Sequence, residues 1–229
     1  MPGDFTTRKE VAEIYRKRAR LYDISANLYY LIGFREQHYR RRAVARLDLR
    51  PGDTVVEIGC GTGLNFHLIE SCIGAGGHLV GVDLSPEMLA RARSRVHRRG
   101  WRNVELIAAS AAEYEFPPRV DGILSTFALT LEPDYDAVVA RGARSLAPGR
   151  RWVIADLRVP RNRLRHLAPL LVWLVRPFAV SLKVAERRPW DSLARHLTGT
   201  TYEETYLGVV YIASGRAPDA TQPRPDGKV

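Results

Sequence analysis

The sequence has few of the features that would indicate a secreted, metal-binding or membrane-spanning protein. It has two cysteines, Cys60 and Cys72, too few for a disulfide framework and without the spacing of a metal site. The longest uncharged apolar run lies between His166 and Arg176, far too short to span a bilayer. The first residues lack the apolar core of a signal peptide, and no repeat is visible. These absences predict a cytoplasmic protein without a metal site.

Negative charge is also scarce relative to positive charge. The chain has 35 Lys and Arg against 25 Asp and Glu, a net charge of +10 at pH 7. Basic residues crowd near the N-terminus, as far as Arg42, and again between Arg158 and Arg195. Such charge suits nucleic acid or an anionic membrane surface. It equally suits a solvated surface that keeps the protein soluble, so composition leaves both interpretations open.

The order of the expected elements predicts an α/β fold. Helical spacing of apolar residues indicates helices near residues 9–22 and 34–47. Strands are expected at Thr54–Ile58, His78–Asp83, Val104–Ala108, Gly122–Thr126, Trp152–Asp156, Tyr202–Tyr206 and Gly208–Ser214. Helices are expected between them at Leu64–Cys72, Pro86–Arg99 and Tyr135–Leu146. Alternating strands and helices predict a doubly wound, mostly parallel, seven-stranded sheet with helices on both faces.

A glycine-rich loop follows the first expected strand and reads Glu57-Ile58-Gly59-Cys60-Gly61-Thr62-Gly63. In open parallel sheets, ligands bind beyond the carboxyl ends of the strands, and glycine lets a ligand approach the backbone closely. A dinucleotide site requires G-x-G-x-x-G, whereas this loop reads G-x-G-x-G, and Glu57 would repel a pyrophosphate. Glu57 instead suits a ligand with a positive centre or an ammonium group. S-adenosylmethionine has both.

The second expected strand ends in an acid. Asp83 follows the glycines by about twenty residues, where a carboxylate can accept hydrogen bonds from both hydroxyls of a ribose. Leu84 and Met88 could line a flat adenine pocket. Ser85 followed by Pro86 is typical of a helix start, with serine as the N-cap and proline at the first position.

Taken together, three motifs resemble the class I S-adenosylmethionine-dependent methyltransferases. They are E-x-G-C-G-T-G, V-G-V-D-x-S-P-x-M-L and L-A-P-G-R-R-W-V-I-A-D-L, and the resemblance covers roughly Tyr15 to Asp156. It implies a Rossmann-like methyltransferase fold with S-adenosylmethionine as cofactor. By this resemblance Glu57 and the loop glycines hold the methionine end, Asp83 holds the ribose, and Leu84 and Met88 contact the adenine.

The resemblance implies a larger set of cofactor residues and shows one departure. The set is Tyr15, Arg18, Tyr22, Glu57, Gly59, Cys60, Gly61, Gly63, Asn65, Asp83, Leu84, Met88, Ser110, Ala111 and Thr126. The family often carries an acid after the third strand, which accepts a hydrogen bond from the adenine amino group. Here Ser110 stands at that place, so either its hydroxyl accepts the bond more weakly or the backbone of Ala111 serves instead.

The N-terminal stretch resembles the ubiquinone and menaquinone biosynthesis methyltransferases. The shared features are the pair Tyr22-Asp23 and Asn27, four residues further on. The resemblance implies a helical lid over the cofactor, which we assign to residues 1–50, with Tyr15, Arg18 and Tyr22 near the methionine carboxylate. Simple core packing would also explain Tyr22.

The loop after the fourth strand resembles a different group. The run Thr126–Tyr135, T-F-A-L-T-L-E-P-D-Y, is similar to a run in bacterial phospholipid and betaine-lipid N-methyltransferases. This loop faces the transferred methyl group in that fold. The resemblance implies a lipid amine headgroup, such as phosphatidylethanolamine, as the methyl acceptor.

A basic, leucine-rich insertion at residues 158–197 lies within the expected methyltransferase domain, residues 51–215. Such a segment can lie in a membrane interface, where each basic residue adds about 1 kcal/mol near an anionic surface. The same leucines could instead pack on the sheet while the arginines stay solvated. Residues 216–229 are expected to form a disordered tail.

The acceptor determines which further residues are needed. An amine must lose a proton before it is methylated, whereas a quinone carbon needs a base to form the phenolate. The candidates for gripping or deprotonating the acceptor are Tyr29, Tyr30, His38 and Asp156.

The sequence is also compatible with three other classes of function. Methylation of a quinone precursor carbon or of a soluble small molecule stays open, as does a non-catalytic S-adenosylmethionine-binding protein. Nucleic acid is not expected as a partner, because the loop from Thr126 lacks the D/N-P-P-Y/F pattern of many nucleic-acid amino-methylases.

Overall fold

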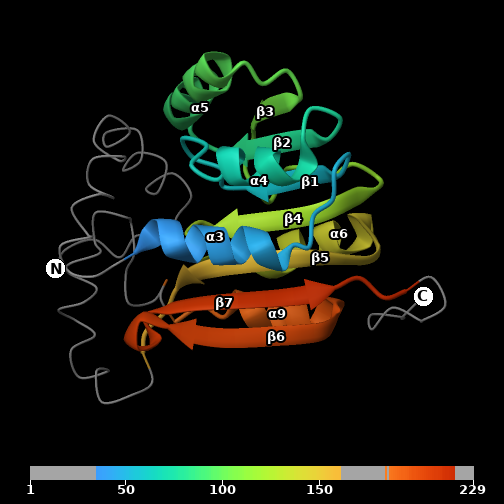
Figure 1. The fold of residues 1–229 in the computed structure, drawn as a ribbon. Coiled ribbons are helices and arrows are strands. Elements are labelled where there is room, and N and C mark those ends of the chain that lie inside the picture. The colour runs from blue at the N-terminus through green and yellow to red at the C-terminus, as the bar shows by residue number, and fades with distance from the viewer. Residues whose placement is uncertain (1–34, 161–183, 185, 220–229) are drawn as a thin grey trace, which may run out of the picture.

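The computed structural model describes residues 35–160, 184 and 186–219 (Figure 1). The expected helix at residues 9–22 and the side chains of Tyr15, Arg18, Tyr22, Tyr29 and Tyr30 lie outside the described residues. Most of the insertion at 158–197 and of the tail lie outside them too. Within the described segments, no helix is long and apolar enough to cross a membrane.

A single seven-stranded sheet has the order β3-β2-β1-β4-β5-β7-β6. Its strands are β1 (Thr54–Ile58), β2 (His78–Asp83), β3 (Val104–Ala108), β4 (Val120–Thr126), β5 (Leu146–Leu157), β6 (Thr198–Thr205) and β7 (Val210–Arg216). Strands β1 to β5 pair in parallel, and β7 runs antiparallel between β5 and β6. The predicted doubly wound, mostly parallel sheet is confirmed.

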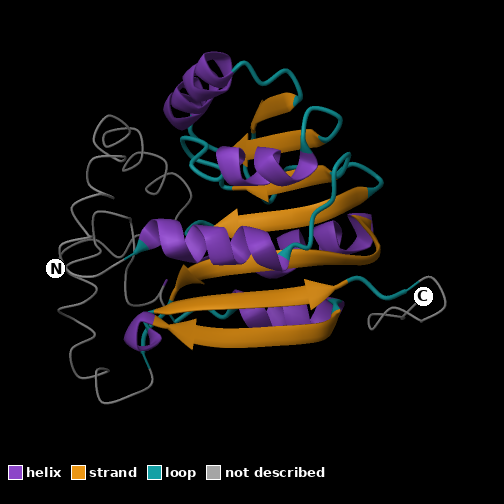
Figure 2. Cartoon of the chain, viewed as in Figure 1, coloured by secondary structure: helices purple, strands orange, loops and turns teal. Residues whose placement is uncertain are grey.

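Helices cover both faces of this sheet (Figure 2). On one face lie α3 (Glu36–Arg46), α4 (Phe66–Ile73) and α5 (Pro86–Arg99); on the other lie α6 (Tyr135–Ser145) and α9 (Pro189–His196). Two short 3-10 turns complete the described elements, η2 (Leu129–Leu131) and η5 (Tyr206–Gly208).

Each face of the sheet has its own apolar core, because successive strand residues point to opposite sides. Along β1, Val55 packs in the core beneath α3, α4 and α5, whereas Val56 packs in the core beneath α6 and α9. Along β5, Val153 packs in the same core as Val55, and Trp152 packs in the same core as Val56. Both side chains are fully buried.

Helix α3 belongs to the layer that covers the sheet. The sequence assigns residues 1–50 to a lid, but Ala43 and Val44 of α3 and the following Leu47 are buried in the same core as Val55. Helix α3 therefore packs on the sheet through its buried face, whereas the lid expected within residues 1–50 stays a prediction.

Several element bounds differ from expectation: β4 begins at Val120, β6 at Thr198 and β7 at Val210, and two further differences have clear local reasons. Helix α4 begins at Phe66 rather than Leu64, because Gly63 has φ +75 and a turn precedes the helix. Strand β5 begins at Leu146 rather than Trp152, because Leu146 already pairs with Val120 across a shift in register. The parallel strands end at one edge of the sheet, where the loops after β1, β2 and β4 meet.

Candidate functional site

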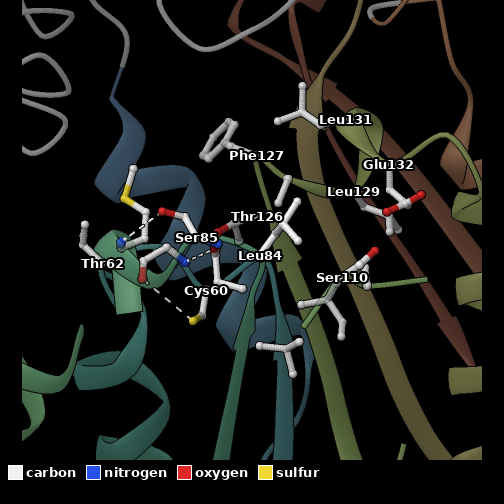
Figure 3. A pocket seen from close by; sticks show the side chains of 18 of the residues that line it. Cys60, Thr62, Leu84, Ser85, Ser110, Thr126, Phe127, Leu129, Leu131 and Glu132 are labelled. Carbon is white, nitrogen blue, oxygen red and sulfur yellow. Dashed lines mark hydrogen bonds between the residues drawn. The ribbon is translucent and has the colours of Figure 1, made fainter. Parts of the chain in front are cut away.

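A pocket opens at the carboxyl edge of β1, β2 and β4 (Figure 3). The space inside it and at its open mouth together amounts to about 970 Å³. Nine of the predicted cofactor residues line it: Gly59, Cys60, Gly61, Asp83, Leu84, Met88, Ser110, Ala111 and Thr126. Residues far apart in the sequence are thus brought together as predicted.

The loop between β1 and α4 requires its glycines for two reasons. Gly59, Gly61 and Gly63 all have positive φ, between +55 and +75, which disfavours any side chain. At Gly59 a Cβ would also lie 2.2 Å from Cβ of Ala128, and at Gly63 it would lie 2.6 Å from the ring of Phe66. At Gly61 no atom lies within 4 Å of such a Cβ. The backbone at Gly61 therefore faces open space at the pocket.

Asp83 joins the two loops that meet beneath the pocket. Its Oδ2 accepts a hydrogen bond from the Gly61 N–H at 2.8 Å, and its Oδ1 accepts one from the Ser85 N–H at 2.9 Å. Ser85 caps α5 by accepting a bond from the Met88 N–H at 3.2 Å. Burial raises the pKa of Asp83. Each carboxylate oxygen has a second acceptor position, so Asp83 can still receive ribose hydroxyls.

Glu57 lies directly behind the glycine loop and is fully buried. The Asn65 Nδ2 donates to its Oε1 at 2.6 Å, while its Oε2 makes no hydrogen bond within the described residues. Burial raises the pKa of Glu57 to about 8. A buried acid with one oxygen unsatisfied fits a ligand that brings an ammonium group, as S-adenosylmethionine does. Glu57, Asn65 and Gly63 adjoin the pocket without lining it.

The predicted residues omit Arg40, a buried cation that lines the pocket. Its Nη1 donates to Thr126 Oγ1 at 2.5 Å, and its Nε donates to Glu36 Oε1 at 2.8 Å. Its guanidinium also lies over the ring of Phe127, 5.2 Å from the centroid. Arg40 stands in a run of three arginines, which is typical of a solvated surface. Its place on the buried stripe of α3, one turn after Glu36, is the signal that could have found it.

The pocket-lining residues Phe127, Leu131 and Glu132 are also absent from the predicted set. Phe127 has φ +55, and its N–H donates to the Ala155 carbonyl at 2.8 Å. Arg187 donates to the carbonyls of both Thr130 and Leu131, which holds this loop against the pocket. All three residues belong to the run Thr126–Tyr135, whose sequence pattern marks the loop but not which of its side chains face the pocket.

Two of the four candidates for acceptor chemistry lie within the described residues, and neither lines the pocket. His38 is exposed and contacts Tyr39 edge to face. Asp156 is buried, and its two oxygens accept hydrogen bonds from the N–H groups of Thr130 and Leu157 at 3.0 and 2.8 Å. Burial raises its pKa to about 6. Asp156 thus positions η2 and does not line the described pocket, and its expected role with the acceptor stays a prediction.

Possible metal ligands do not cluster: no group of three or more His, Cys, Asp or Glu that could hold an ion occurs among the described residues. Cys60 is buried at the pocket wall, and burial raises its pKa well above the usual value, so its thiol stays protonated.

Comparisons with known proteins agree with this geometry. Residues 55–149 match a family described as a methyltransferase domain. The chain is 34% identical over 142 residues to phosphatidylethanolamine N-methyltransferase of Cereibacter sphaeroides, covering 61% of this chain and 64% of that protein. It is 28% identical over 207 residues to demethylmenaquinone methyltransferase of Symbiobacterium thermophilum, covering 86% of this chain and 80% of that protein.

Coverage differs among the relatives, and the structural likeness is broader. The chain is 32% identical to arsenite methyltransferase of Halobacterium salinarum but spans only 28% of it. The fold matches Haemonchus contortus phosphoethanolamine N-methyltransferase 2 with a TM-score of 0.68 at 18% identity, over 91% of this chain and 60% of that chain. Residues 55–149 thus match a methyltransferase domain, and the family match, the relatives and the fold together support a class I S-adenosylmethionine-dependent methyltransferase with S-adenosylmethionine as its cofactor.

Proposed function

We propose that this protein methylates the amine of a lipid headgroup, of the phosphatidylethanolamine kind, at a membrane surface. The observation that carries the proposal is the run Thr126–Tyr135, which resembles that of phospholipid N-methyltransferases and lines the pocket through Phe127 and Leu131. Similarity to the phosphatidylethanolamine N-methyltransferase of Cereibacter sphaeroides, at 34% identity, supports it.

The pocket supplies an environment suited to an amine. A lysine-like amine has a pKa of about 10.4 in water, and burial beside apolar groups lowers such a pKa because it disfavours the charged form. Phe127 and Leu131 would provide those apolar groups, so the amine would enter with its lone pair free. No protein base at the reacting atoms is then needed, in keeping with the place of Asp156 beneath η2.

Positioning is the main contribution expected of this chain. The bound cofactor supplies an already activated methyl group on a sulfonium. Well-oriented reactants recover about 7–11 kcal/mol of barrier. The glycine loop, Asp83 and Glu57 would fix the cofactor, while the loop held by Arg187 would fix the acceptor.

Methylation of a quinone precursor is the second candidate, favoured by one observation. Similarity to demethylmenaquinone methyltransferase of Symbiobacterium thermophilum extends over 86% of this chain, more than that to the lipid enzyme. A phenolate-forming base would then be required. Asp83 and Glu132 are the carboxylates that line the described pocket, and both already accept backbone hydrogen bonds.

The acceptor can be identified directly with radiolabelled S-adenosylmethionine. The full chain would be incubated with vesicles containing phosphatidylethanolamine, with vesicles containing demethylmenaquinone, and with soluble phosphoethanolamine. Label in phosphatidylethanolamine is the expected result. Label only in the quinone would establish the second candidate, and label only in the soluble amine would refute action at a membrane.

A further inference from the structure

We propose that an arginine-rich surface on α5 docks the protein onto an anionic membrane, beside the mouth of the cofactor pocket. This surface, called here the α5 arginine face, comprises Arg91, Arg93, Arg98, Arg99 and Arg102. It is separate from the basic stretches near the N-terminus and between Arg158 and Arg195. The inference rests on the proposed function, in which the methyl acceptor is a membrane lipid.

The charge of this segment is not offset by acids within it. Residues 91–102 contain six arginines and one histidine, and no aspartate or glutamate. Arg91, Arg95 and Arg99 recur at four-residue steps, and like charges at that spacing destabilise a helix. Among the described residues, no carboxylate forms an ion pair with the α5 arginine face. The counter-charge for this surface therefore comes from solvent ions or from a partner.

The neighbouring helices extend the positive charge across one face of the sheet. Helix α4 lies between α3 and α5 and packs on β2 (Figure 1). Burial lowers the pKa of His67 on α4. The charges of Arg99, Arg95 and Arg41 lower this pKa further. Arginines of α3 and α5 thus act on one group between them, so the positive potential spans three helices.

The α5 arginine face is joined to the pocket through the start of the helix. Leu84 lines the pocket, is 41% exposed and precedes the helix cap Ser85. Arg91 follows Ser85 by about 9 Å along the helix axis, close to one Debye length at physiological ionic strength. An anionic surface docked on α5 would therefore meet the pocket mouth as well, where Leu84 offers it an apolar side chain.

The chemistry of the face favours a membrane over a nucleic acid. Proteins that bind single-stranded nucleic acid combine a basic groove with aromatic side chains that stack on the bases. Trp101, at the end of this segment, packs against the apolar core instead. A membrane requires no such ring, because basic clusters attract anionic headgroups by charge alone. Each arginine near such a surface contributes about fivefold in affinity.

Sedimentation with vesicles tests this surface on the full chain without any methyl transfer. The vesicles would contain phosphatidylcholine with or without phosphatidylglycerol. We expect the native protein to bind the anionic vesicles and to be released as salt is raised. The triple variant Arg91→Gln/Arg98→Gln/Arg99→Gln should bind them at least about tenfold more weakly. Its helix should stay intact, because these side chains are at least partly exposed and like charges are removed.

A matched triple variant separates the surface from net charge. Arg119→Gln/Arg144→Gln/Arg216→Gln removes the same charge from exposed arginines elsewhere on the described surface. It should bind anionic vesicles within about threefold of the native protein, because charges beyond a Debye length are screened. Both variants should bind S-adenosylhomocysteine with native affinity by calorimetry, which checks that the fold is preserved.

The outcomes judge the docking surface apart from the acceptor. Equal weakening of both triple variants would overturn the proposal in favour of net charge alone. Native binding by the α5 variant, or no binding of the native protein to anionic vesicles, would also overturn it. Binding to a short RNA that depends on α5, without vesicle binding, would reassign the face to nucleic acid. Failure to methylate lipid would refute the proposed function and leave α5-dependent vesicle binding standing.

Discussion

Asn65 donates a hydrogen bond to Oε1 of Glu57 at 2.6 Å and leaves Oε2 of that buried carboxyl unsatisfied within the described residues. Burial raises the pKa of Glu57 to about 8, so the free protein holds this group mainly protonated at neutral pH. An ammonium group bound beside it would favour the ionised form. Binding of the cofactor is therefore expected to be coupled to loss of the proton from Glu57.

The first prediction is that binding of S-adenosylmethionine releases about one proton at pH 7, because Glu57 goes from protonated to ionised as its pKa falls. The affinity should accordingly rise as the pH increases from about 6 to 7.5. Calorimetry in two buffers of different ionisation enthalpy measures the proton directly. Glu57→Gln should bind without proton release, and an equal release in this variant would assign the proton to another group.

A second prediction concerns Gly59. Gly59→Ala places a Cβ 2.2 Å from Cβ of Ala128, in addition to the strain of φ +69, so cofactor affinity should fall more than tenfold. Gly52→Ala is the matched control, since Gly52 has φ +90 with no atom within 4 Å of a Cβ. That control should lose only about 1–2 kcal/mol of stability and keep its affinity.

A double substitution tests the origin of this effect. Ala128→Gly removes the methyl that Gly59→Ala would contact, so the pair should bind the cofactor better than Gly59→Ala alone. Affinities would be compared by calorimetry. No recovery in the double variant would mean that the contact with Ala128 is not the cause.

The third prediction separates stability from binding at Arg40. Arg40→Met leaves the carboxylate of Glu36 buried without its cation, which should cost about 3–5 kcal/mol in the free energy of unfolding. Glu36→Gln with Arg40→Met should recover much of that loss. Denaturant unfolding measures both variants.

Cofactor affinity should follow a different pattern in the same variants. Arg40 lines the pocket and holds Thr126, so affinity should stay reduced even when stability returns. Full recovery of affinity in the double variant would show that Arg40 serves the fold alone.

The fourth prediction concerns Asp156→Asn. Because both oxygens accept backbone N–H groups, an amide would turn a donor toward one of them and cost about 1–3 kcal/mol of stability. The value of kcat should change far less than the 10²–10⁴-fold typical of a lost general base. A loss of that size with unaltered thermal unfolding would restore the catalytic role that the sequence suggested.

Local sequence patterns predicted the bounds of those elements whose ends are determined by neighbouring residues. The bounds of β1, β2, β3 and α5 agree with expectation residue for residue. Helix α5 has both a serine cap at Ser85 and a left-handed glycine, Gly100, at its end. Strand β5 was expected to begin too late, since its first residues, L-A-P-G-R, are typical of a turn, and only pairing with β4 reveals the strand.

The missed site residues have partners that are distant in the sequence. Arg40 contacts Thr126, 86 residues away, and its burial depends on how α3 packs on the sheet. Leu131 lines the pocket in a loop whose carbonyls accept hydrogen bonds from Arg187, which is 56 residues away. Charged side chains are usually exposed, so sequence patterns assign such residues to the surface unless the tertiary fold is known.

The most direct test is the formation of S-adenosylhomocysteine by the full chain with phosphatidylethanolamine vesicles. Mass spectrometry would count the cofactor product and the methylated headgroup together, with Gly59→Ala at a low cofactor concentration as the weakened control. We expect equal amounts of the two products, and both reduced more than tenfold in the control. Tight cofactor binding without either product, with this and every other acceptor offered, would contradict the conclusion that the protein is a methyltransferase. It would indicate a non-catalytic S-adenosylmethionine-binding protein.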